Sequence, residues 1–316
     1  MLLVVCPNLA IDRILQVDKF KTGQIQRSSQ ALIQPGGKGS NAARVYRQLG
    51  GDVVLAGFVG RKNGRYITEP LRRAGIRVEV IPAYEESRIC TIICELNSGF
   101  HPTVVNEESP QVDSAAAGRL IRTIERWIPK VDGILTTGSL STGLAPDFYA
   151  AIIDCGRTRG KITAIDATGA ALRNALAVRP AFIKPNTDEM RQLLSGSSIS
   201  MLAAHTALTF GKAGASLLVE GKCLYASPPQ TYDVNPIGAG DAFAAGYLKM
   251  LLQQRPASEC LRVAMAAAAA DASTLPPGFV DPAEVASLAS RVEVRFTTPD
   301  IPLNPGPSIV PAGQLH

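Results

Sequence analysis

After Pro110 the chain alternates short apolar runs with longer segments of helical periodicity, and this alternation restricts its fold more than any other feature. Strands that alternate with helices form βαβ units, whose strands lie parallel in one sheet beneath a cover of helices. The apolar run at residues 1–6 has no polar alternation, which is typical of a strand buried on both faces of such a sheet. We therefore expect an α/β fold built on a mostly parallel sheet.

The predicted elements fall into a main layer and a smaller outer sheet. Stretches within about 12–34 and 88–106 alternate apolar and polar residues, as half-exposed strands outside the main layer do. Without a long linker in the body, we expect residues 1–296 to form one domain and the Pro-rich residues 297–316 a tail without a core. In the main layer we expect strands at 1–6, 53–59, 78–81, 133–136, 162–165, 181–183 and 215–219, and a hairpin with arms at 223–226 and 231–234. We expect one helix that ends at residue 49. The other expected helices span 70–74, 113–127, 146–158, 170–177, 187–194, 200–208, 241–254, 258–272 and 282–291.

Composition disfavours several classes of function. Apolar residues make up 46% of the chain and charged residues 19%, and the net charge of +5 comes from scattered Lys and Arg. We therefore expect neither a nucleic acid nor a membrane as partner. The first apolar run is too short for a signal peptide or a membrane span, and the six cysteines and three histidines form no zinc pattern. Free thiols fit a reducing compartment, so we expect a cytoplasmic protein.

The stretch Gly238-Ala239-Gly240-Asp241 runs directly into a long apolar segment. Its small residues leave backbone amides uncovered at a predicted helix N-terminus, where the helix dipole favours anions. Asp241 is open to two interpretations. It is either an ordinary acid of the first helical turn or a base for a hydroxyl that attacks a phosphoryl group held by the amides.

Other nucleotide-binding and hydrolytic motifs are absent from the sequence. A Walker A loop requires Gly-Lys followed by Ser or Thr, whereas Lys38 is followed by Gly39 and Lys212 by Ala213. Residues 37–42 match Gly-x-Gly-x-x-Ala, but no acidic residue closes the next predicted strand to bind a ribose, which disfavours a nicotinamide-dependent dehydrogenase. The Gly-x-Ser-x-Gly elbow of serine hydrolases is also missing.

Small polar clusters stand where predicted strands end, which is where open α/β sheets bind ligands. Each has an ordinary alternative: Asp12 caps a turn, Glu189 lies on a solvated helix face, and Arg88 is an exposed strand cation. Their joint occurrence favours a binding site over these alternatives. The clusters are Asp12, Gly36 to Asn41, Gly138-Ser139, Lys184-Pro185-Asn186 with Glu189, Gly211 with Gly214, and Gly238 to Asp241.

Taken in this order, the motifs resemble those of the phosphofructokinase B branch of the ribokinase-like sugar kinases, over about residues 1–295. The resemblance implies a doubly wound α/β domain with helices on both faces of the sheet, a small β-sheet lid over the sugar site, and an enzyme that uses ATP and Mg²⁺. It is carried by Asn8 with Asp12, Gly36-Gly37-Lys38-Gly39-x-Asn41, Thr137-Gly138-Ser139-Leu140, Lys184-Pro185-Asn186-x-x-Glu189 and Gly238-Ala239-Gly240-Asp241.

The resemblance also implies a role for each motif. Asp241 is the expected base for the acceptor hydroxyl, and the amides of Gly238, Ala239 and Gly240 form the expected anion hole. Asn186 and Glu189 are expected to place Mg²⁺, through water. The residues expected against the nucleotide are Lys184, Asn186, Gly211 and Gly214. The residues expected to bind the sugar are Asp12, Gly36, Gly37, Lys38, Asn41, Arg88 and Ser139.

The expected acceptor is a phosphorylated ketohexose, and Arg88 carries most of that inference. An arginine on a lid strand offers the forked geometry that binds a phosphate already on the sugar, and Lys38 offers a second cation. Residues 22–24 lack the lid lysine of certain 6-phosphofructokinases of the family, which favours fructose 1-phosphate and 1-phosphofructokinase activity. The alternatives are tagatose-6-phosphate kinase or 6-phosphofructokinase, then a kinase of an unphosphorylated sugar or nucleoside, and then a non-catalytic sugar-phosphate-binding protein.

Two points remain open in the sequence. Asn235-Pro236 replaces the Asp-Thr that is usual in the family, where the acidic residue helps some relatives to hold a monovalent cation, so activation by potassium is in doubt. The resemblance also allows a homodimer in which two lids pair.

Overall fold

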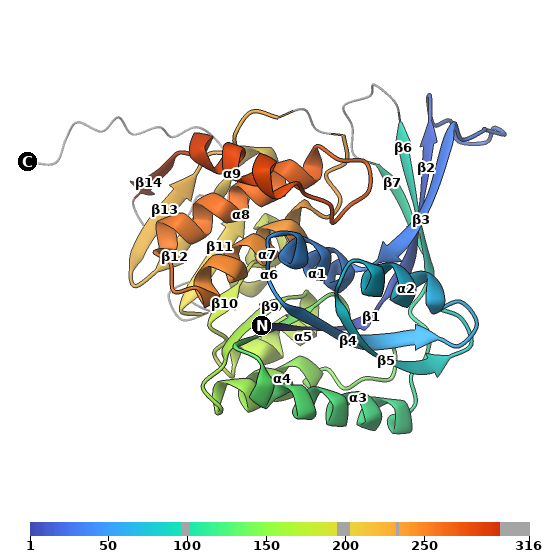
Figure 1. The fold of residues 1–316 in the computed structure, drawn as a ribbon, viewed down its shortest axis with the longest axis horizontal. Coiled ribbons are helices and arrows are strands. Elements are labelled where there is room, and N and C mark those ends of the chain that lie inside the picture. The colour runs from blue at the N-terminus through green and yellow to red at the C-terminus, as the bar shows by residue number, and fades with distance from the viewer. Residues whose placement is uncertain (96–101, 195–202, 232–233, 298–316) are drawn as a thin grey trace, which may run out of the picture.

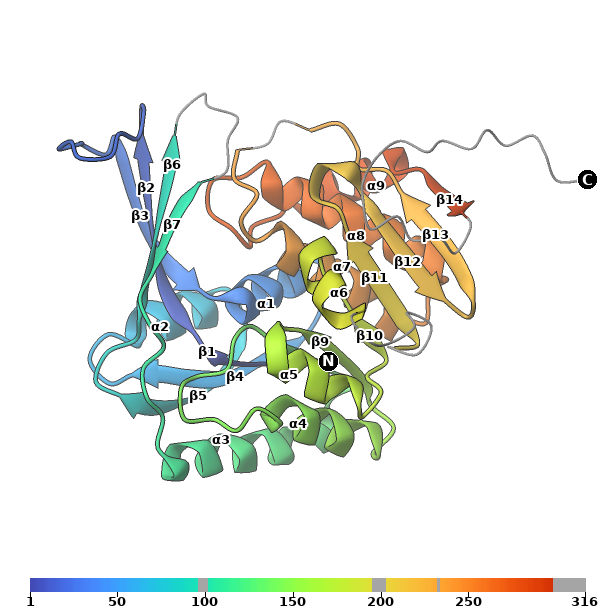
Figure 2. The ribbon, with the colours of Figure 1, turned by 180° about the vertical axis from the view of Figure 1, so that it is seen from behind.

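The computed structural model covers the whole chain and describes residues 1–95, 102–194, 203–231 and 234–297. These residues form a ten-stranded sheet with helices on both faces and a separate four-stranded sheet at one end (Figures 1 and 2). The predicted α/β fold, with a mostly parallel main sheet and a small outer sheet, is confirmed.

The strand order of the large sheet reverses beside β1. The order is β14-β13-β12-β11-β10-β9-β8-β1-β4-β5, parallel from β5 to β11 and antiparallel from β11 to β14. The chain winds from β1 to β4 and β5 on one side and later returns to β8 on the other, so the sheet is doubly wound and its switch point lies between β1 and β8. The strands are β1 (Leu2–Asn8), β4 (Val53–Gly60), β5 (Arg77–Tyr84), β8 (Gly133–Thr137), β9 (Ile162–Asp166), β10 (Phe182–Ile183), β11 (His205–Thr209), β12 (Ala215–Val219), β13 (Lys222–Ala226) and β14 (Val294–Thr297).

Strand β1, which lies at the switch point of the sheet, is buried along its whole length, because helices cover both faces of the sheet. Leu2 and Val4 belong to one core, which includes side chains of α1, α2, α7, α8 and α9, whereas Leu3 and Val5 belong to a second core with α3, α4, α5 and α6. The helices are α1 (Lys38–Gln48), α2 (Arg65–Arg73), α3 (Ser114–Trp127), α4 (Phe148–Arg157), α5 (Gly169–Leu176), α6 (Thr187–Leu194), α7 (Ala239–Leu252), α8 (Ala257–Ala272) and α9 (Pro282–Arg291).

The small sheet continues directly from the large one, since β2 begins two residues after β1 ends. Its strands lie in the order β3-β2-β6-β7, with β2 (Ala10–Val17), β3 (Gln30–Gly36), β6 (Ile89–Glu95) and β7 (Thr103–Asn106). Its inner face packs Ile14, Ile92 and Cys94 against Ile237 and Leu275 of the main body. The small sheet therefore contacts the loop that leads into α7.

Three predicted details are wrong. Residues 205–208 of the helix predicted at 200–208 belong to the strand β11, because β10 and β12 pair with them on both sides. The hairpin arm predicted at 231–234 falls partly outside the described residues, and neither Thr231 nor Val234 is in a strand. The antiparallel partner of β13 on that side is instead β14, which was not predicted and includes Thr297, placed in the predicted tail.

Within the described residues, no helix combines the length and apolar character needed to cross a bilayer. All six cysteines are unpaired. Cys90 and Cys94 are buried on β6, as expected of cysteines that pack in a core.

Candidate active site

Helix α7 begins at a glycine turn that brings Asp241 into a buried position. Gly238 has a φ of 94°, which glycine adopts without strain, and no side chain caps the helix. The first amides of a helix lack intrahelical acceptors, so this turn presents N–H groups together with the positive end of the helix dipole. Asp241, the third residue of α7, is only 7% exposed. An acid that serves only the helix dipole does not need such burial, so a chemical role is favoured.

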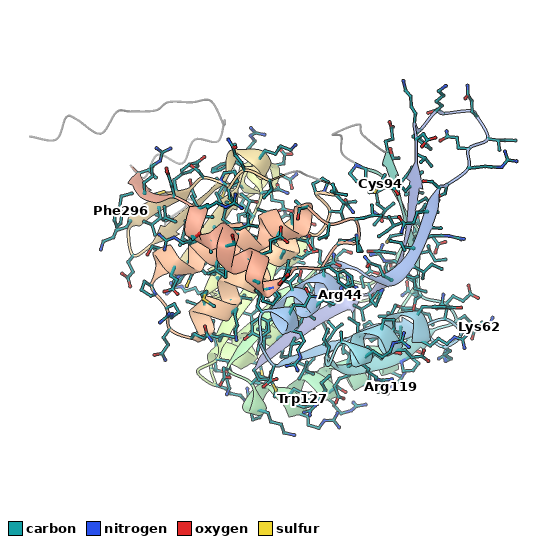
Figure 3. All side chains as sticks on the ribbon, turned by 45° about the horizontal axis from the view of Figure 1, so that its top comes forward. Arg44, Lys62, Cys94, Arg119, Trp127 and Phe296 are labelled. Atoms are coloured by element: carbon teal, nitrogen blue, oxygen red, sulfur yellow. The ribbon has the colours of Figure 1, made fainter. Side chains whose placement is uncertain are left out.

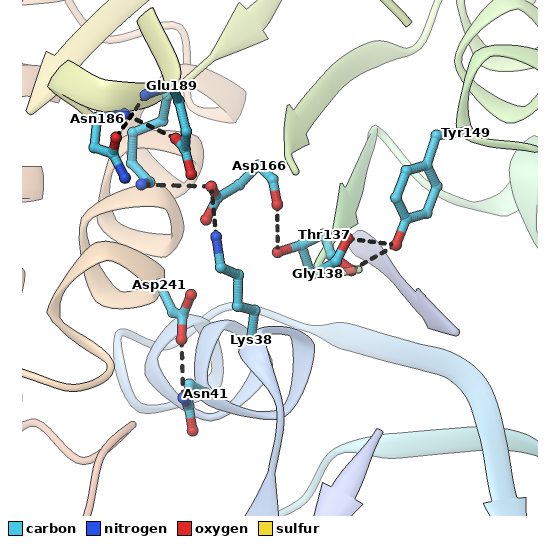
Figure 4. A network of polar contacts seen from close by, with 10 residues as sticks. Lys38, Asn41, Thr137, Gly138, Tyr149, Asp166, Asn186, Glu189 and Asp241 are labelled. Atoms are coloured by element: carbon cyan, nitrogen blue, oxygen red, sulfur yellow. Dashed lines mark hydrogen bonds and ion pairs between the residues drawn. The ribbon is translucent and has the colours of Figure 1, made fainter. Parts of the chain in front are cut away.

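Asp241 has the surroundings of a proton acceptor. Asn41 Nδ2 donates a hydrogen bond to Asp241 Oδ2 at 2.8 Å (Figure 4). Burial raises the pKa of Asp241 to about 7, while the charge of Lys38 and the Asn41 hydrogen bond oppose the rise and nearby Asp166 adds to it. A carboxylate with a pKa near 7 is matched to the removal of a hydroxyl proton at neutral pH.

Asp166, at the end of β9, was missed in the sequence and lies at the centre of the site. Its Oδ1 lies 3.1 Å from Lys38 Nζ and 3.5 Å from Lys184 Nζ. Burial raises the pKa of this carboxyl, but the two lysines outweigh burial and lower it, so Asp166 is ionised. The pKa of Lys38 is correspondingly raised, first by Asp166. The one available signal was an acid directly after a predicted strand.

Residues at the end of β8 fix the backbone around Asp166. The Thr137 hydroxyl donates to the Asp166 carbonyl oxygen at 3.2 Å, and Gly138 N donates to the same oxygen at 3.0 Å. The buried Tyr149 hydroxyl donates to the carbonyl oxygens of Thr137 and Gly138 (Figure 4). The Thr-Gly motif predicted for the sugar site thus also holds the neighbouring strand end.

Asp12 and Arg88 lie together on the small-sheet side of the site. Asp12 is buried on β2, and its carboxylate lies so close to Gly36 that a Cβ at position 36 would overlap it. Burial raises the pKa of Asp12 to about 6, and the charges of Arg44 and Arg88 oppose the rise. Gly36 is therefore needed because only glycine leaves room for this carboxylate.

Arg88 and Asn8 present polar atoms that lack partners. Arg88 donates to the carbonyl oxygen of Asn8 at 3.4 Å and to that of Glu107 at 3.5 Å, and it forms no ion pair among the described residues. Asn8 Nδ2 donates to Ser139 Oγ at 2.8 Å. Arg88 Nε and Asn8 Oδ1 are buried without a hydrogen-bond partner in the described part of the chain. Such orphaned groups are costly unless a ligand satisfies them.

Lys38 and Arg88, the two cations expected to hold a sugar phosphate, differ in their surroundings. Lys38 is paired with Asp166, so its charge is already offset within the protein. Gly37, which precedes it, has a φ of 87° and lies against the backbone of Asn8 and Leu9. Arg88 is thus the better placed of the two to bind an additional anion.

Asn186 and Glu189 cap α6 reciprocally. Asn186 N donates to Glu189 Oε2 and Glu189 N donates to Asn186 Oδ1, each at 2.9 Å. The described residues contain no group of three or more His, Cys, Asp or Glu that could hold a metal ion. Mg²⁺ commonly keeps several waters and uses one or two carboxylates plus substrate phosphates, so Glu189 fits such a role without an all-protein cage.

The remaining predicted nucleotide residues lie along the same edge of the sheet. Lys184 is buried after β10, and its Nζ would lie 3.2 Å from a Cβ placed on Gly240, at the first turn of α7. Gly211 and Gly214 follow β11 with φ of 57° and 100°. Nothing lies within 4 Å of a Cβ placed on Gly211, so its backbone is open to a ligand.

Asn235, which stands where the family usually has an aspartate, forms two hydrogen bonds in the structure. Asn235 is fully buried, its Nδ2 donates to the Leu275 carbonyl oxygen at 2.8 Å, and its Oδ1 accepts from Ile237 N at 3.1 Å. A neutral amide therefore joins the loop before α7 to the loop after α8.

A buried carboxylate, helix amides and two lysines at one edge of a doubly wound sheet supply the base, the anion site and the cations that an α/β enzyme needs to transfer a phosphoryl group. Comparison with known proteins gives the particular family. The sequence model of the pfkB family of carbohydrate kinases matches residues 1–278, so the chain belongs to this family and is a carbohydrate kinase.

Known relatives agree with this assignment along nearly the whole chain. A tagatose-6-phosphate kinase of Staphylococcus epidermidis is 29% identical over 310 residues, covering 93% of this chain and 99% of the relative. The structure of a possible 1-phosphofructokinase from Thermotoga maritima matches with a TM-score of 0.80 at 19% identity, over 94% of this chain and 99% of the other. Phosphofructokinase-2 from Escherichia coli, in complex with substrates and products, also has a TM-score of 0.80 at 19% identity, over 92% and 98% of the chains.

Proposed function

We propose that this kinase phosphorylates a phosphorylated ketohexose with ATP and Mg²⁺, and that its substrate is fructose 1-phosphate, giving fructose 1,6-bisphosphate. The observation that carries the proposal is Arg88, half-buried beside Asp12 with an unpartnered Nε and no ion pair in the described residues. A half-buried guanidinium of this kind matches a phosphate, which accepts two parallel hydrogen bonds from it.

The acceptor chemistry assigns different ends of the sugar to different elements. A ketohexose phosphate has its phosphate at one end and a primary hydroxyl at the other. We assign the phosphate to Arg88 and the sugar hydroxyls to Asp12 and Asn41, whose carboxylate and amide pair well with a diol. Asn8 Oδ1 and Ser139 are further polar groups on this side of the site.

Transfer requires a base and a place for developing negative charge. Asp241 accepts the proton of the primary hydroxyl, whose oxygen then attacks the terminal phosphorus of ATP, and the bond from that phosphorus to ADP breaks. The amides of Gly238, Ala239 and Gly240 stabilise the charge on the transferred group. The proton ends on Asp241, whose pKa near 7 allows its later release to water.

The nucleotide is assigned to Lys184, Asn186 and the open glycine loop at Gly211 and Gly214. Bound Mg²⁺ would neutralise phosphate charge, and Asn186 and Glu189 would hold it through water. Asp166 pairs with both Lys184 and Lys38, so it holds these two cations at the site where the phosphates would bind.

A second candidate substrate is tagatose 6-phosphate. The two curated relatives at 29% and 28% identity are tagatose-6-phosphate kinases, which favours this substrate over an unphosphorylated sugar. Its phosphate and acceptor hydroxyl exchange ends relative to fructose 1-phosphate, so the same residues can serve both.

One assay separates the candidates. Release of ADP is measured over fructose 1-phosphate, fructose 6-phosphate, tagatose 6-phosphate, ribose and adenosine, each at a series of concentrations. We expect the highest kcat/KM with fructose 1-phosphate. A higher value with tagatose 6-phosphate would transfer the assignment to that substrate, and a higher value with ribose or adenosine would contradict the role given to Arg88.

We also infer a cytoplasmic location, supported by the six unpaired cysteines, and a homodimer formed through the small sheets. The tetrameric form described for phosphofructokinase-2 of Escherichia coli supports assembly in general. The outer strands expose Ile33 and Val105, which supports contact through this sheet. Size-exclusion chromatography with light scattering tests the dimer.

A further inference from the structure

We propose that Arg44 is a positioning residue for Asp241, because it determines which end of the Asn41 amide faces the base. The inference rests on the proposed role of Asp241 and deepens it. Arg44 lies on α1, outside the sequence motifs from which the site was predicted. It contacts neither Asp241 nor any residue assigned to the nucleotide. Figure 3 labels it on α1, beside the C-terminal helices.

Arg44 is buried and holds three acceptors at once. Its Nη2 donates to Asn41 Oδ1 at 2.7 Å and to the Pro277 carbonyl oxygen at 2.7 Å, and its Nη1 donates to the Pro35 carbonyl oxygen at 2.8 Å. The guanidinium also lies over the ring of Phe279, 5.0 Å from its centroid. These contacts hold both Nη atoms of the guanidinium, while its Nε is buried without a hydrogen-bond partner in the described part of the chain.

The orientation of Asn41 follows from donor and acceptor chemistry. A guanidinium can only donate, so the end of the amide that faces Arg44 must be the oxygen. The NH₂ end then faces Asp241, where it donates to Oδ2 at 2.8 Å. A flipped amide would offer Asp241 an oxygen, which favours the protonated acid over the ionised base. Arg44 thus acts on Asp241 through one intervening side chain.

Charged residues from several elements affect the pKa of Asp241, and the charge of Arg44 is one of them. Lys38 and Lys184 favour the ionised base, whereas Asp166 and Asp271 oppose it. Arg44 interacts electrostatically with Asp12, Asp271 and Asp241. A test must therefore keep the positive charge and remove only the fixed set of N–H donors that the guanidinium provides. Arg44→Lys does this, because a single ammonium cannot reproduce the three fixed bonds.

Gln48 provides a matched control. Its Nε2 donates to the Gly278 carbonyl oxygen at 3.4 Å and its Oε1 accepts from Val280 N at 2.6 Å, so it anchors the same loop that Arg44 contacts at Pro277. Gln48 does not contact Asn41. If Arg44 served only to anchor the loop, Gln48→Ala and Arg44→Lys would have similar effects.

The experiment is the pH dependence of kcat from pH 5.5 to 9.5 at saturating substrates. For Arg44→Lys we expect the acid limb to move up by about one pH unit, so that kcat falls about tenfold at pH 6.5 and little at pH 9, the effect of losing one hydrogen bond to an ionised group. For Gln48→Ala we expect no movement. An acid limb that stays in place in Arg44→Lys, or moves equally in Gln48→Ala, overturns the proposal.

A double variant tests the path through Asn41. In Asn41→Ala the link between Arg44 and Asp241 is cut, so adding Arg44→Lys should move the acid limb no further, whereas additive shifts would contradict the proposal. Asn41→Asp keeps the test decisive if Arg44→Lys does not fold. In Asn41→Asp the side chain offers Asp241 only oxygens, so the acid limb should move up even with Arg44 intact, and an unchanged limb would refute the orientation argument. Normal turnover of Asp241→Asn would instead refute the proposed base, which separates the two failures.

Discussion

Replacing Asp241 by Asn should abolish most of the activity and at the same time stabilise the fold at neutral pH. The substitution keeps the size of the side chain, and an amide oxygen can still accept the 2.8 Å hydrogen bond from Asn41, so both substrates should bind with near-normal affinity. The base is lost, so kcat should fall by at least ~10²-fold.

The stability gain follows from the pKa of the buried carboxyl. Burial raises the pKa of Asp241 from 3.8 to about 7, so the folded state holds the proton more tightly than the unfolded state does. The contribution of Asp241 to stability is therefore fully present below pH 3.8 and is lost as the pH rises through 7. Burial of this carboxyl costs on the order of 4 kcal/mol of folding free energy at pH 8, and about 2 kcal/mol at pH 5, where the folded state holds it protonated and the unfolded state ionises it.

The assay compares urea denaturation of both proteins at pH 5 and pH 8. The gain in free energy of unfolding on Asp241→Asn should be about 2–3 kcal/mol larger at pH 8, and any pH-independent effect of the substitution cancels in this difference. Asp52→Asn is the control, since the Asp52 side chain is 72% exposed and pairs with Arg47 rather than with a residue of the site, and an ion pair this exposed contributes little to stability. A gain that is equal at both pH values would refute the burial argument, and near-normal kcat would refute the base.

Three further substitutions test the other assignments. Arg88→Ala should raise KM for the sugar phosphate by roughly ten- to a hundredfold, as for a lost charge-assisted contact of about 1.5–3 kcal/mol, with much less effect on KM for ATP; similar changes in both KM values would remove Arg88 from the acceptor site. Glu189→Gln should raise the Mg²⁺ concentration needed for half-maximal rate about tenfold at fixed ATP, which a magnesium titration measures, and an unchanged titration would leave Glu189 with capping alone. Lys184→Met should raise KM for ATP by about tenfold or more, because a buried cation is lost beside the first turn of α7; a change confined to the sugar KM would contradict the nucleotide assignment.

Local patterns in the sequence were sufficient for the alternating fold. Apolar runs with no polar alternation, such as residues 1–6, mark strands covered on both faces, and this pattern holds for β1 and β4. The small sheet was predicted from the alternation of apolar and polar residues within 12–34 and 88–106, and in the structure β6 alternates buried and half-buried residues. Both patterns involve only residues that are close in the sequence, which is why the strands could be predicted from the sequence.

The errors arise where distant segments decide the structure. Residues 205–209 have no strong strand pattern of their own, and they become β11 because β10 and β12 pair with them on both sides. Asp166 was missed for the same reason, since its importance comes from Lys38, more than a hundred residues away in the chain. Arg44 likewise gains its position from Pro277 across 233 residues. The spacing of motifs in the sequence does not predict which residues from such distant segments will be in contact.

The position of β1 between β4 and β8 has a consequence for the order in which the sheet is completed during synthesis. β1 is made first, pairs with β4 on one edge, and needs β8 for the other. Roughly 70 residues separate β4 from β8, which a ribosome adds in about 4–15 s. During this interval an apolar strand has an unpaired edge, which is a template for association with other chains. Nascent chains that stall between residues 60 and 133 should therefore be the aggregation-prone ones and should depend most on chaperones.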